Sequence, residues 1–401
     1  MRLAFTRLVT AALALAGWSL AAPAAPTKVS FWFYMPSVTG YNQLQAFVTE
    51  FNKMQSKYEV TATGQGDPKT EAVKIIASLR GEQPPTMVLV DNAFFNRLAI
   101  GGQAANLDKF AATLPAATIQ DFYPNVWQFG EVNGHRYGLP WATSMLVLYY
   151  NADALQARGL QPPKTWDEIA KTAKALTTRA SKGLIWLLDM WWFESLVNGR
   201  GGQLFKNNQA LFNGPDAMDA LKYLMDLNKA GALLPRGYSE LSLMAIDFMR
   251  TKAMMVVGPT SVFPTAKEYQ YAMKIGVVAL PGRTIAGEGQ IAILNRADPD
   301  AQAGAWAFWQ YLNRPENLAR FVKASFYLPT RRSVTTALGD FIAENPALAQ
   351  GLIGLERADN FPHAADLNDW ELTLNTALER VLKGNDDPVK TMTDAQRATK
   401  P

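Results

Sequence analysis

Residues 28–92, with the sequence KVSFWFYMPSVTGYNQLQAFVTEFNKMQSKYEVTATGQGDPKTEAVKIIASLRGEQPPTMVLVDN, decide the fold class. Short apolar runs alternate there with longer stretches in which apolar residues recur at helical spacing, as Leu44, Phe47 and Phe51 do. The pattern predicts a strand at 28–33, a helix at 41–57, a strand at 58–63, a helix at 68–80 and a strand at 86–90. Continuous apolar strands between helices are typical of a parallel sheet, so we predict an α/β fold.

The rest of the 401-residue chain continues this alternation and is long enough for two domains. A capping box at 165–168 starts one helix, Pro215 fits the first turn of another, and 301–324 has helical spacing, with Pro315 restarting the turn. Late strands are predicted at 253–257 and 275–280. The sequence contains no internal repeat and no low-complexity linker, so ordered segments must join the two domains.

Composition and charge exclude several classes of function. The chain has 39 Lys and Arg against 35 Asp and Glu without a block of like charges, so its charge favours neither a nucleic acid nor a membrane surface as partner. Cysteine is absent, which excludes thiol catalysis, cysteine-ligated zinc, iron–sulfur sites and disulfides. Two histidines, His135 and His363, leave little for a metal site, and we expect no metal and no cofactor.

Residues 1–25 predict a secretory signal peptide. Arg2 and Arg7 precede about 15 apolar residues, fewer than the roughly 20 that span a bilayer, and Ala22-Pro23-Ala24 supplies small residues for cleavage. An N-terminal membrane anchor is the alternative. Cleavage would leave a nearly neutral mature protein, which we expect to be periplasmic, or extracytoplasmic in a similar compartment, and not lipid-anchored because it has no cysteine.

The common catalytic and nucleotide-binding motifs are missing from the sequence. Asp298-Pro299-Asp300 could suggest a cation site, but it precedes a helix, where acidic residues meet the positive end of the helix dipole, so we interpret it as a cap. We therefore predict that the protein is not an enzyme. An exported glycoside hydrolase remains an alternative, because a pair of carboxylates can be assembled from distant residues.

Aromatic residues are abundant, with 11 Trp, 13 Tyr and 20 Phe, and several fall in turns or at strand ends. Aromatic faces pack on the C–H faces of sugars, while nearby polar groups bond the ligand's hydroxyls. Ligands of open α/β sheets bind beyond the carboxyl ends of the strands. Tyr34, Asp91 and Asn92 occupy such positions and are candidate ligand contacts. For any single aromatic residue, a place in the core is the alternative.

Three long segments carry a resemblance to a known family. They are SFWFYMPSVTGYNQLQAFVTEFNK at 30–53, VLYYNADALQARGLQPPKTWDEI at 147–169 and YLNRPENLARFVKASFYLPTRRS at 311–333. These segments resemble the extracytoplasmic solute-binding proteins of ABC importers, family 1, in the branch of the maltose- and glycerol-3-phosphate-binding proteins. Further segments in the family's order extend the resemblance over nearly the whole mature chain.

The resemblance implies the two-lobed, type II periplasmic-binding-protein fold, in which three crossing segments join two α/β lobes around a ligand cleft. The N-terminal lobe would comprise 27–142 and 277–328, the C-terminal lobe 143–276 and 329–401, and the crossings would lie near Trp141, Ile275 and Leu328. In this family, closure of the lobes around the ligand is the state that the membrane permease recognises.

The resemblance also implies ligand contacts at individual positions. They are Tyr34, Asp91, Ser144, Trp191, Trp192, Ser261, Gly289 and Tyr327. A structural role stays open for each of them. Ser144 and Ser261 could merely satisfy the end of a strand, and one of the two tryptophans could pack inward.

The chain departs from the glycerol-3-phosphate branch at one position that matters for the ligand. The late phosphate-binding arginine of that branch would fall within 364–384, where the chain has Asp369, Trp370 and Glu371. Trp370 would offer a stacking plane and Asp369 a hydroxyl acceptor, so the sequence favours a neutral carbohydrate. sn-Glycerol 3-phosphate or a glycerophosphodiester is the alternative, with an arginine from elsewhere, such as Arg331, compensating.

The predicted function is thus the substrate-binding component of an ABC importer. The protein would capture a sugar or glycerol-phosphate-type solute by lobe closure and deliver it to the transmembrane subunits of a permease. The resemblance implies a monomer.

Overall fold

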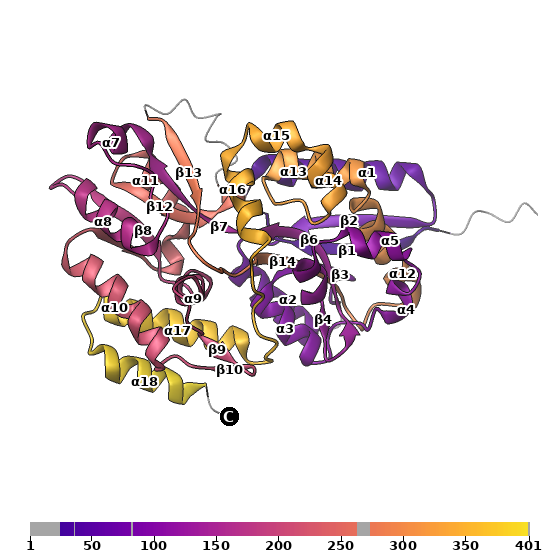
Figure 1. Ribbon diagram of the computed structural model, residues 1–401. Helices are drawn as coiled ribbons and strands as arrows, with labels where there is room; N and C mark the ends of the chain where they lie inside the picture. The colour runs from indigo at the N-terminus through magenta and orange to yellow at the C-terminus, as the bar shows by residue number, and fades with distance from the viewer. Residues whose placement is uncertain (1–24, 36, 82, 263–272, 400–401) are drawn as a thin grey trace, which may run out of the picture.

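The computed structural model describes residues 25–35, 37–81, 83–262 and 273–399. It has two lobes, each with helices packed against a five-stranded sheet (Figure 1). The predicted signal peptide lies outside the described residues except for Ala25. Within the described ranges, no helix is long and apolar enough to cross a membrane.

The first lobe is built on a sheet with the strand order β2-β1-β3-β14-β6. Strands β1 (Thr27–Phe33), β2 (Tyr58–Gly64) and β3 (Met87–Asp91) run parallel, and β14 (Gly287–Ile293) runs antiparallel to both β3 and β6 (Gly138–Ser144). Its helices are α1 (Val38–Met54), α2 (Pro68–Arg80), α3 (Asn92–Ile100), α4 (Asp108–Ala111), α5 (Ala116–Asp121), α6 (Pro124–Phe129), α12 (Pro299–Leu312) and α13 (Pro315–Ser325). The parallel βαβαβ start predicted from 28–92 is therefore confirmed.

The second lobe repeats this arrangement, with the strand order β11-β8-β12-β7-β13. Strands β8 (Lys182–Leu187), β11 (Leu233–Arg236) and β12 (Ala253–Pro259) run parallel, and β7 (Leu146–Asn151) runs antiparallel to β12 and β13 (Ile275–Ala279). Its helices are α7 (Ala152–Ala157), α8 (Trp166–Leu176), α9 (Met190–Gly199), α10 (Pro215–Lys229), α11 (Leu241–Met249), α17 (Leu367–Leu382) and α18 (Pro388–Ala398). In each sheet, four strands thus run in one direction and one, β14 or β7, runs the opposite way.

Short elements complete the described chain. They are the hairpins β4 (Glu131–Val132) with β5 (His135–Arg136) and β9 (Phe205–Lys206) with β10 (Gln209–Ala210), the 3₁₀ turns η1 (Tyr238–Glu240) and η2 (Thr260–Val262), and the helices α14 (Arg332–Ala337), α15 (Gly339–Ala343) and α16 (Pro346–Leu355).

Local sequence signals explain where several helices begin. The Asp67 carboxylate accepts bonds from the backbone N–H groups of Lys69 and Thr70 at 3.0 and 3.1 Å, with Pro68 in the first turn, so α2 starts where it was predicted. The hydroxyl of Thr165 caps α8 by accepting from the N–H of Glu168.

The expected break at Pro315 is present, whereas the expected side-chain cap at Asp298 was wrong in detail. The helical stretch predicted at 301–324 is two helices, α12 and α13, and the second begins at Pro315 as predicted, because proline cannot donate the backbone bond that would continue the first helix. Asp298 precedes α12 by position, but its side chain makes no hydrogen bond to the first turn, so its contribution is limited to charge near the helix dipole.

Many of the aromatic residues lie in the cores of the two lobes. Trp141, Trp186 and Trp309 are fully buried, and Trp141 stacks on Phe321 with ring centroids 4.1 Å apart. Burying side chains of this size stabilises a fold by about 1.5–3 kcal/mol each. The high aromatic content is therefore largely a packing feature, and only a minority of these rings can contact a ligand.

The first two crossings between the lobes come slightly later than expected. Trp141 lies inside β6, and the chain passes to β7 through Met145. β13 pairs with β7 through Ala279, so residues 277–279 belong to the second sheet and the chain crosses back at 280–286. Both shifts have the same physical reason. Residues at the end of a strand keep their backbone hydrogen bonds by staying in the sheet, so the chain crosses to the other lobe only after the last paired residue.

The third crossing also comes later than the expected position at Leu328. Leu328 pairs with Thr143 of the first sheet, and the guanidinium of Arg331 bonds Asp121 at 2.7 Å, which keeps the start of α14 on the first lobe. α16 then packs on β13 and β7 of the second lobe. Asp359 pairs with Ile285, so the last two crossing segments run side by side.

Candidate functional site

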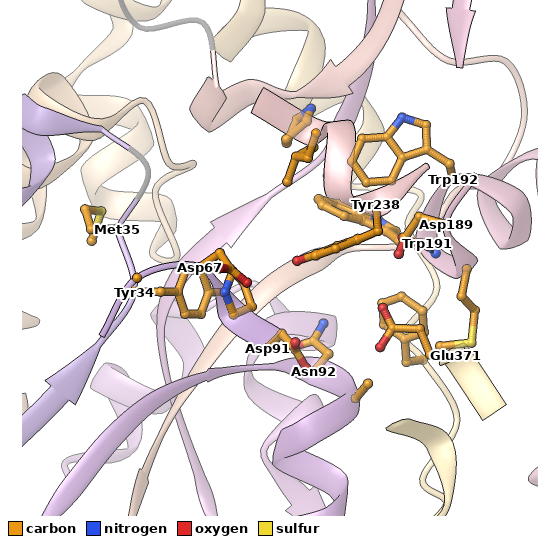
Figure 2. A pocket seen from close by; sticks show the side chains of 17 residues that line it. Tyr34, Met35, Asp67, Asp91, Asn92, Asp189, Trp191, Trp192, Tyr238 and Glu371 are labelled. Carbon is orange, nitrogen blue, oxygen red and sulfur yellow. Dashed lines mark hydrogen bonds between the residues drawn. The ribbon is translucent and has the colours of Figure 1, made fainter. Parts of the chain in front are cut away.

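A cavity of about 440 Å³ lies between the two lobes (Figure 2). It is bordered by the carboxyl ends of the three parallel strands of each sheet, where ligands of open α/β sheets bind. The first lobe contributes Tyr34, Met35, Gly66, Asp67, Pro68, Asp91, Asn92 and Ala93, and the second contributes Asp189, Met190, Trp191, Trp192, Tyr238, Leu241, Pro259 and Glu371, with Phe361 from the third crossing. A solute held there would contact both lobes at once.

Three helices begin at this cavity, and each is capped by its own aspartate. Asp67 caps α2, Asp91 accepts from the N–H of Phe94 at 2.8 Å at the start of α3, and Asp189 accepts from the N–H of Trp191 at 2.9 Å at the start of α9. A helix N-terminus attracts anions through its free N–H groups and its dipole. Here a carboxylate of the protein already occupies that position at all three helices.

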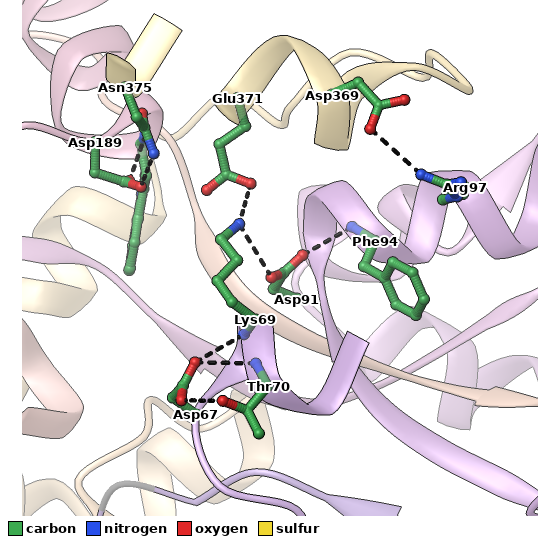
Figure 3. Close-up of polar contacts among 11 residues, drawn as sticks. Asp67, Lys69, Thr70, Asp91, Phe94, Arg97, Asp189, Asp369, Glu371 and Asn375 are labelled. Carbon is green, nitrogen blue, oxygen red and sulfur yellow. Dashed lines mark hydrogen bonds and ion pairs between the residues drawn. The ribbon is translucent and has the colours of Figure 1, made fainter. Parts of the chain in front are cut away.

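Lys69 in the first turn of α2 connects the lobes across the cavity (Figure 3). Its ammonium forms an ion pair with Glu371 of α17, lies 3.9 Å from the Asp91 carboxylate, and sits 5.4 Å from the centre of the Tyr238 ring. Burial opposes the positive charge of Lys69, but the nearby carboxylates outweigh burial and raise the pKa of its ammonium above the usual range. Lys69 therefore keeps its charge.

The electrostatic field of the cavity is negative. Burial raises the pKa of the Tyr238 hydroxyl, and Asp189, Asp91, Glu371 and Asp67 raise it further. Burial likewise raises the pKa of Glu371, while Lys69 opposes that change. Even without Glu371, the three aspartates at the helix starts outnumber the ammonium of Lys69.

The two adjacent tryptophans of α9 are both fixed by hydrogen bonds. The indole N–H of Trp191 donates to the carbonyl of Ile285 and that of Trp192 to the carbonyl of Val257, each at 2.9 Å. Trp192 is only 3% exposed, whereas Trp191 is half-buried. Trp191 therefore presents the more accessible ring to the cavity, and Trp192 packs mostly inward behind it.

Five of the ten sequence-predicted site residues line the cavity, namely Tyr34, Asp91, Asn92, Trp191 and Trp192. The other five, Ser144, Ser261, Gly289, Tyr327 and Trp370, lie elsewhere. Gly289 nevertheless touches the site indirectly, because a Cβ atom there would come within 3.0 Å of the Tyr34 hydroxyl. It leaves room for Tyr34.

The remaining four have structural surroundings. Ser144 shares a hydrogen bond of 2.9 Å with the Thr260 hydroxyl in a buried position, and Ser261 is also fully buried. The ring of Tyr327 stacks on a neighbouring core ring, that of Phe321. Trp370 stacks on Phe205 outside the cavity. Each residue turns a helix by about 100°, so the next residue, Glu371, occupies the position that faces the cavity.

Sequence reasoning missed Asp67, Asp189, Tyr238 and Glu371. The two aspartates had a usable signal, since each precedes a helix after a strand, as Asp91 does. Glu371 had no such signal in the sequence, because its partner Lys69 is 302 residues away along the chain. Only the packing of α17 beside α3 brings the two together.

Other candidate chemistry finds no support among the described residues. No group of three or more His, Cys, Asp or Glu side chains in those ranges could hold a metal ion. His135 pairs with Asp108 at 2.6 Å, and His363 bonds Asn96 at 2.8 Å, so both histidines have structural partners.

Comparison with known proteins agrees with this geometry. The periplasmic sn-glycerol-3-phosphate-binding proteins UgpB of Escherichia coli O1:K1 and of Rhizobium meliloti are each 24% identical to the chain. The first match covers 85% of this chain and 83% of that protein, and the second covers 95% of both.

Solved structures share the fold at lower identity. UgpB of Mycobacterium tuberculosis in complex with glycerophosphocholine superposes with a TM-score of 0.83 at 21% identity, covering 94% of this chain and 98% of that one. The GacH receptor of Streptomyces glaucescens, solved unliganded and with acarbose, gives 0.80 at 21% identity, covering 93% and 97%. The predicted two-lobed periplasmic-binding-protein fold is confirmed.

The bacterial extracellular solute-binding protein family has a model that matches residues 46–350 of the chain. The chain belongs to this family, as the sequence resemblance predicted. The family is one of solute-binding proteins rather than enzymes.

Proposed function

We propose that the protein is the substrate-binding component of an ABC importer for a polyhydroxylated solute without a phosphate monoester. The cavity between the lobes is the observation that carries this proposal, because its lining combines aromatic faces with carboxylate, amide and phenol groups from both lobes. Aromatic faces fit the C–H surfaces of sugars, and the polar groups fit their hydroxyls.

The charges around the cavity argue against glycerol 3-phosphate. A phosphate dianion is bound by a bidentate guanidinium or by free backbone N–H groups, yet none of the described lining residues is an arginine. Arg331 is engaged by Asp121, and Arg200 by Asp219 at 2.7 Å. Since three aspartates also cap the helices that begin here, a phosphate would meet carboxylates where it needs donors.

The proposed mechanism is closure of one lobe against the other. A solute that contacts both lobes stabilises the closed form by its greater affinity for that form. The ion pair of Lys69 with Glu371 also joins the lobes and would break on opening. Release to a permease then requires a partner that pulls the lobes apart, and no chemical change in the solute.

Location and partners follow from the relatives and from the composition. The curated relatives are named as periplasmic proteins, and the chain has no cysteine that could carry a lipid. We propose export through the predicted signal peptide, a monomeric mature form, and the transmembrane subunits of an ABC permease as partner.

A thermal-shift screen of the mature protein tests this proposal. The screen compares neutral mono- and oligosaccharides with glycerol 3-phosphate and glycerophosphocholine. A solute at about 100 times its Kd adds roughly 2.7 kcal/mol to the free energy of unfolding. Small-angle scattering should show a more compact particle with each solute that stabilises the fold.

Two results would contradict the proposal. One is an unchanged scattering profile with every stabilising solute. The other is recovery of a stabilising oligosaccharide in cleaved form, which would instead support the glycoside hydrolase alternative.

A further inference from the structure

The carboxylates around the cavity retain surface that Lys69 does not cover. The side chains of Asp91 and Glu371 are 20% and 10% exposed, even though both lie near the Lys69 ammonium. Asp67 and Asp189 add their charges from the starts of α2 and α9. One ammonium facing this many acidic groups leaves the cavity with an unbalanced negative potential.

The cavity also has aromatic faces, and one of them already holds a cation. The Lys69 ammonium lies over the ring of Tyr238, 5.4 Å from its centre, with Glu371 beside it. Figure 2 shows Tyr238 reaching into the cavity from the second lobe, with Trp191 near it. An aromatic face with carboxylates at its edge is the arrangement that favours ammonium groups, because the ring quadrupole and the negative charges attract the same partner.

We infer that the cleft selects solutes that carry a positively charged nitrogen together with their hydroxyl groups. The inference rests on the proposed function and deepens it by naming the charge of the solute. Two sources share this chemistry: a primary ammonium, as on an amino sugar, and a quaternary ammonium, as on choline. The cation would lie near Tyr238 and Trp191, beside Asp91 and Glu371.

The first experiment compares probes that differ only in charge. Choline is titrated against its uncharged carbon isostere 3,3-dimethylbutan-1-ol, and glucosamine at about pH 6, where its amine is protonated, against glucose, which has a hydroxyl in place of that ammonium. Glycerol 3-phosphate serves as the anionic probe. In at least one arm, we expect the cation to bind about tenfold more tightly than its neutral partner, and the arm that responds identifies the source.

The second experiment removes carboxylate charge without changing side-chain shape. Asp189→Asn and Asp91→Asn should each reduce the preference for the cation by about threefold or more, and asparagine keeps the caps on α9 and α3. Asp219→Asn is the matched control, since Asp219 lies outside the cavity and pairs with Arg200. Binding of the neutral isostere checks that each variant has kept its cleft.

Each outcome decides the inference. A preference for the cation that falls in both cleft variants and persists in the control supports it. Equal binding of charged and neutral partners in both arms overturns it, as does tighter binding of glycerol 3-phosphate, while binding of any neutral sugar would leave the proposed function standing. A protein that binds none of these probes and no sugar of the screen contradicts both.

Discussion

The two lobes have the same sheet plan but bring different chemistry to the cleft. Where the parallel strands of the first lobe end, the chain continues into polar helix starts with Asp67, Lys69 and Asp91. At the matching ends in the second lobe Asp189 also caps a helix, but the cavity lining there is mainly aromatic, with Trp191, Trp192 and Tyr238, against Tyr34 in the first lobe. The repeated fold therefore fixes where functional side chains stand, and the residues at those places set what each lobe can bind.

The lobes also differ in how they reach across the cleft. The first lobe extends a long cation, Lys69, whereas the second offers rings that are held in place, as Trp191 is by its bond to Ile285. A ring that is already ordered loses little conformational entropy on binding. We therefore expect the rings of the second lobe to supply most of the binding energy, and the carboxylates of both lobes to supply charge selectivity.

The largest expected effect concerns a buried carboxyl in each lobe. Glu71 of α2 is fully buried with both oxygens unpaired, and burial, with a smaller contribution from Asp91, raises its pKa from 4.5 to about 9. The folded protein holds this proton while the unfolded chain releases it, so the free energy of unfolding should fall as pH rises from about 4.5 to 9. The slope from Glu71 is up to about 1.4 kcal/mol per pH unit.

Glu71→Gln should flatten this decline in denaturant unfolding measured across the pH range. Glu59→Gln, on the exposed surface, is the control. Burial, and then Asp359, also raise the pKa of Glu194 in α9, so Glu194→Gln should flatten the remaining slope in the second lobe. Identical slopes for the parent protein and Glu71→Gln would show that Glu71 is ionised in the folded state.

Next in size is the loss of the aromatic face of the second lobe. Trp191→Ala should weaken binding of the solute found in the screen by about 2 kcal/mol, or roughly thirtyfold, since buried tryptophans dominate binding energies. Trp370→Ala is the matched control, because that ring stacks on Phe205 outside the cavity. If calorimetry shows that Trp370→Ala weakens binding as much as Trp191→Ala does, the placement of Trp191 at the cavity and of Trp370 outside it is wrong.

A smaller effect is expected from crowding Tyr34 in the first lobe. A Cβ atom at Gly289 would lie 2.8 Å from the Val90 carbonyl and 3.0 Å from the Tyr34 hydroxyl, so Gly289→Ala must displace one of them. We expect a loss of about 1 kcal/mol in affinity, as for other overpacked sites. Gly339→Ala, which would meet no atom within 4 Å, should leave affinity unchanged. An unaltered Kd for Gly289→Ala would contradict the expectation that this substitution displaces Tyr34 from its contact with the solute.

The smallest effect is expected at the exposed ion pair that joins the lobes. Arg97 of α3 lies 3.4 Å from Asp369 of α17, with side chains 41% and 64% exposed. Solvent screens such pairs, so Asp369→Asn should change the free energy of unfolding by less than about 0.5 kcal/mol. A change above 1 kcal/mol would indicate a larger role for this pair in holding the lobes together.

Much of the fold was predictable because its signals are local. The spacing of Leu44, Phe47 and Phe51 and the cap at Asp67 involve neighbours within a few residues, and the helices form where these signals fall. The site was harder to predict. Tyr34 and Asp91 directly follow strands, and both were predicted. Trp370 was predicted in place of Glu371, because the sequence of α17 does not determine which side of that helix faces the cavity.

By itself, the sequence determined the alternation of strands and helices, the α/β class, the family and the absence of cysteine chemistry. These follow from side-chain pattern and composition, which act over short distances along the chain. The tertiary structure decided which lobe each crossing segment joins, which tryptophan faces the cleft, and that Lys69 meets Glu371 from 302 residues away. Such contacts depend on how whole lobes pack, and the sign of the charge in the cleft depends on them.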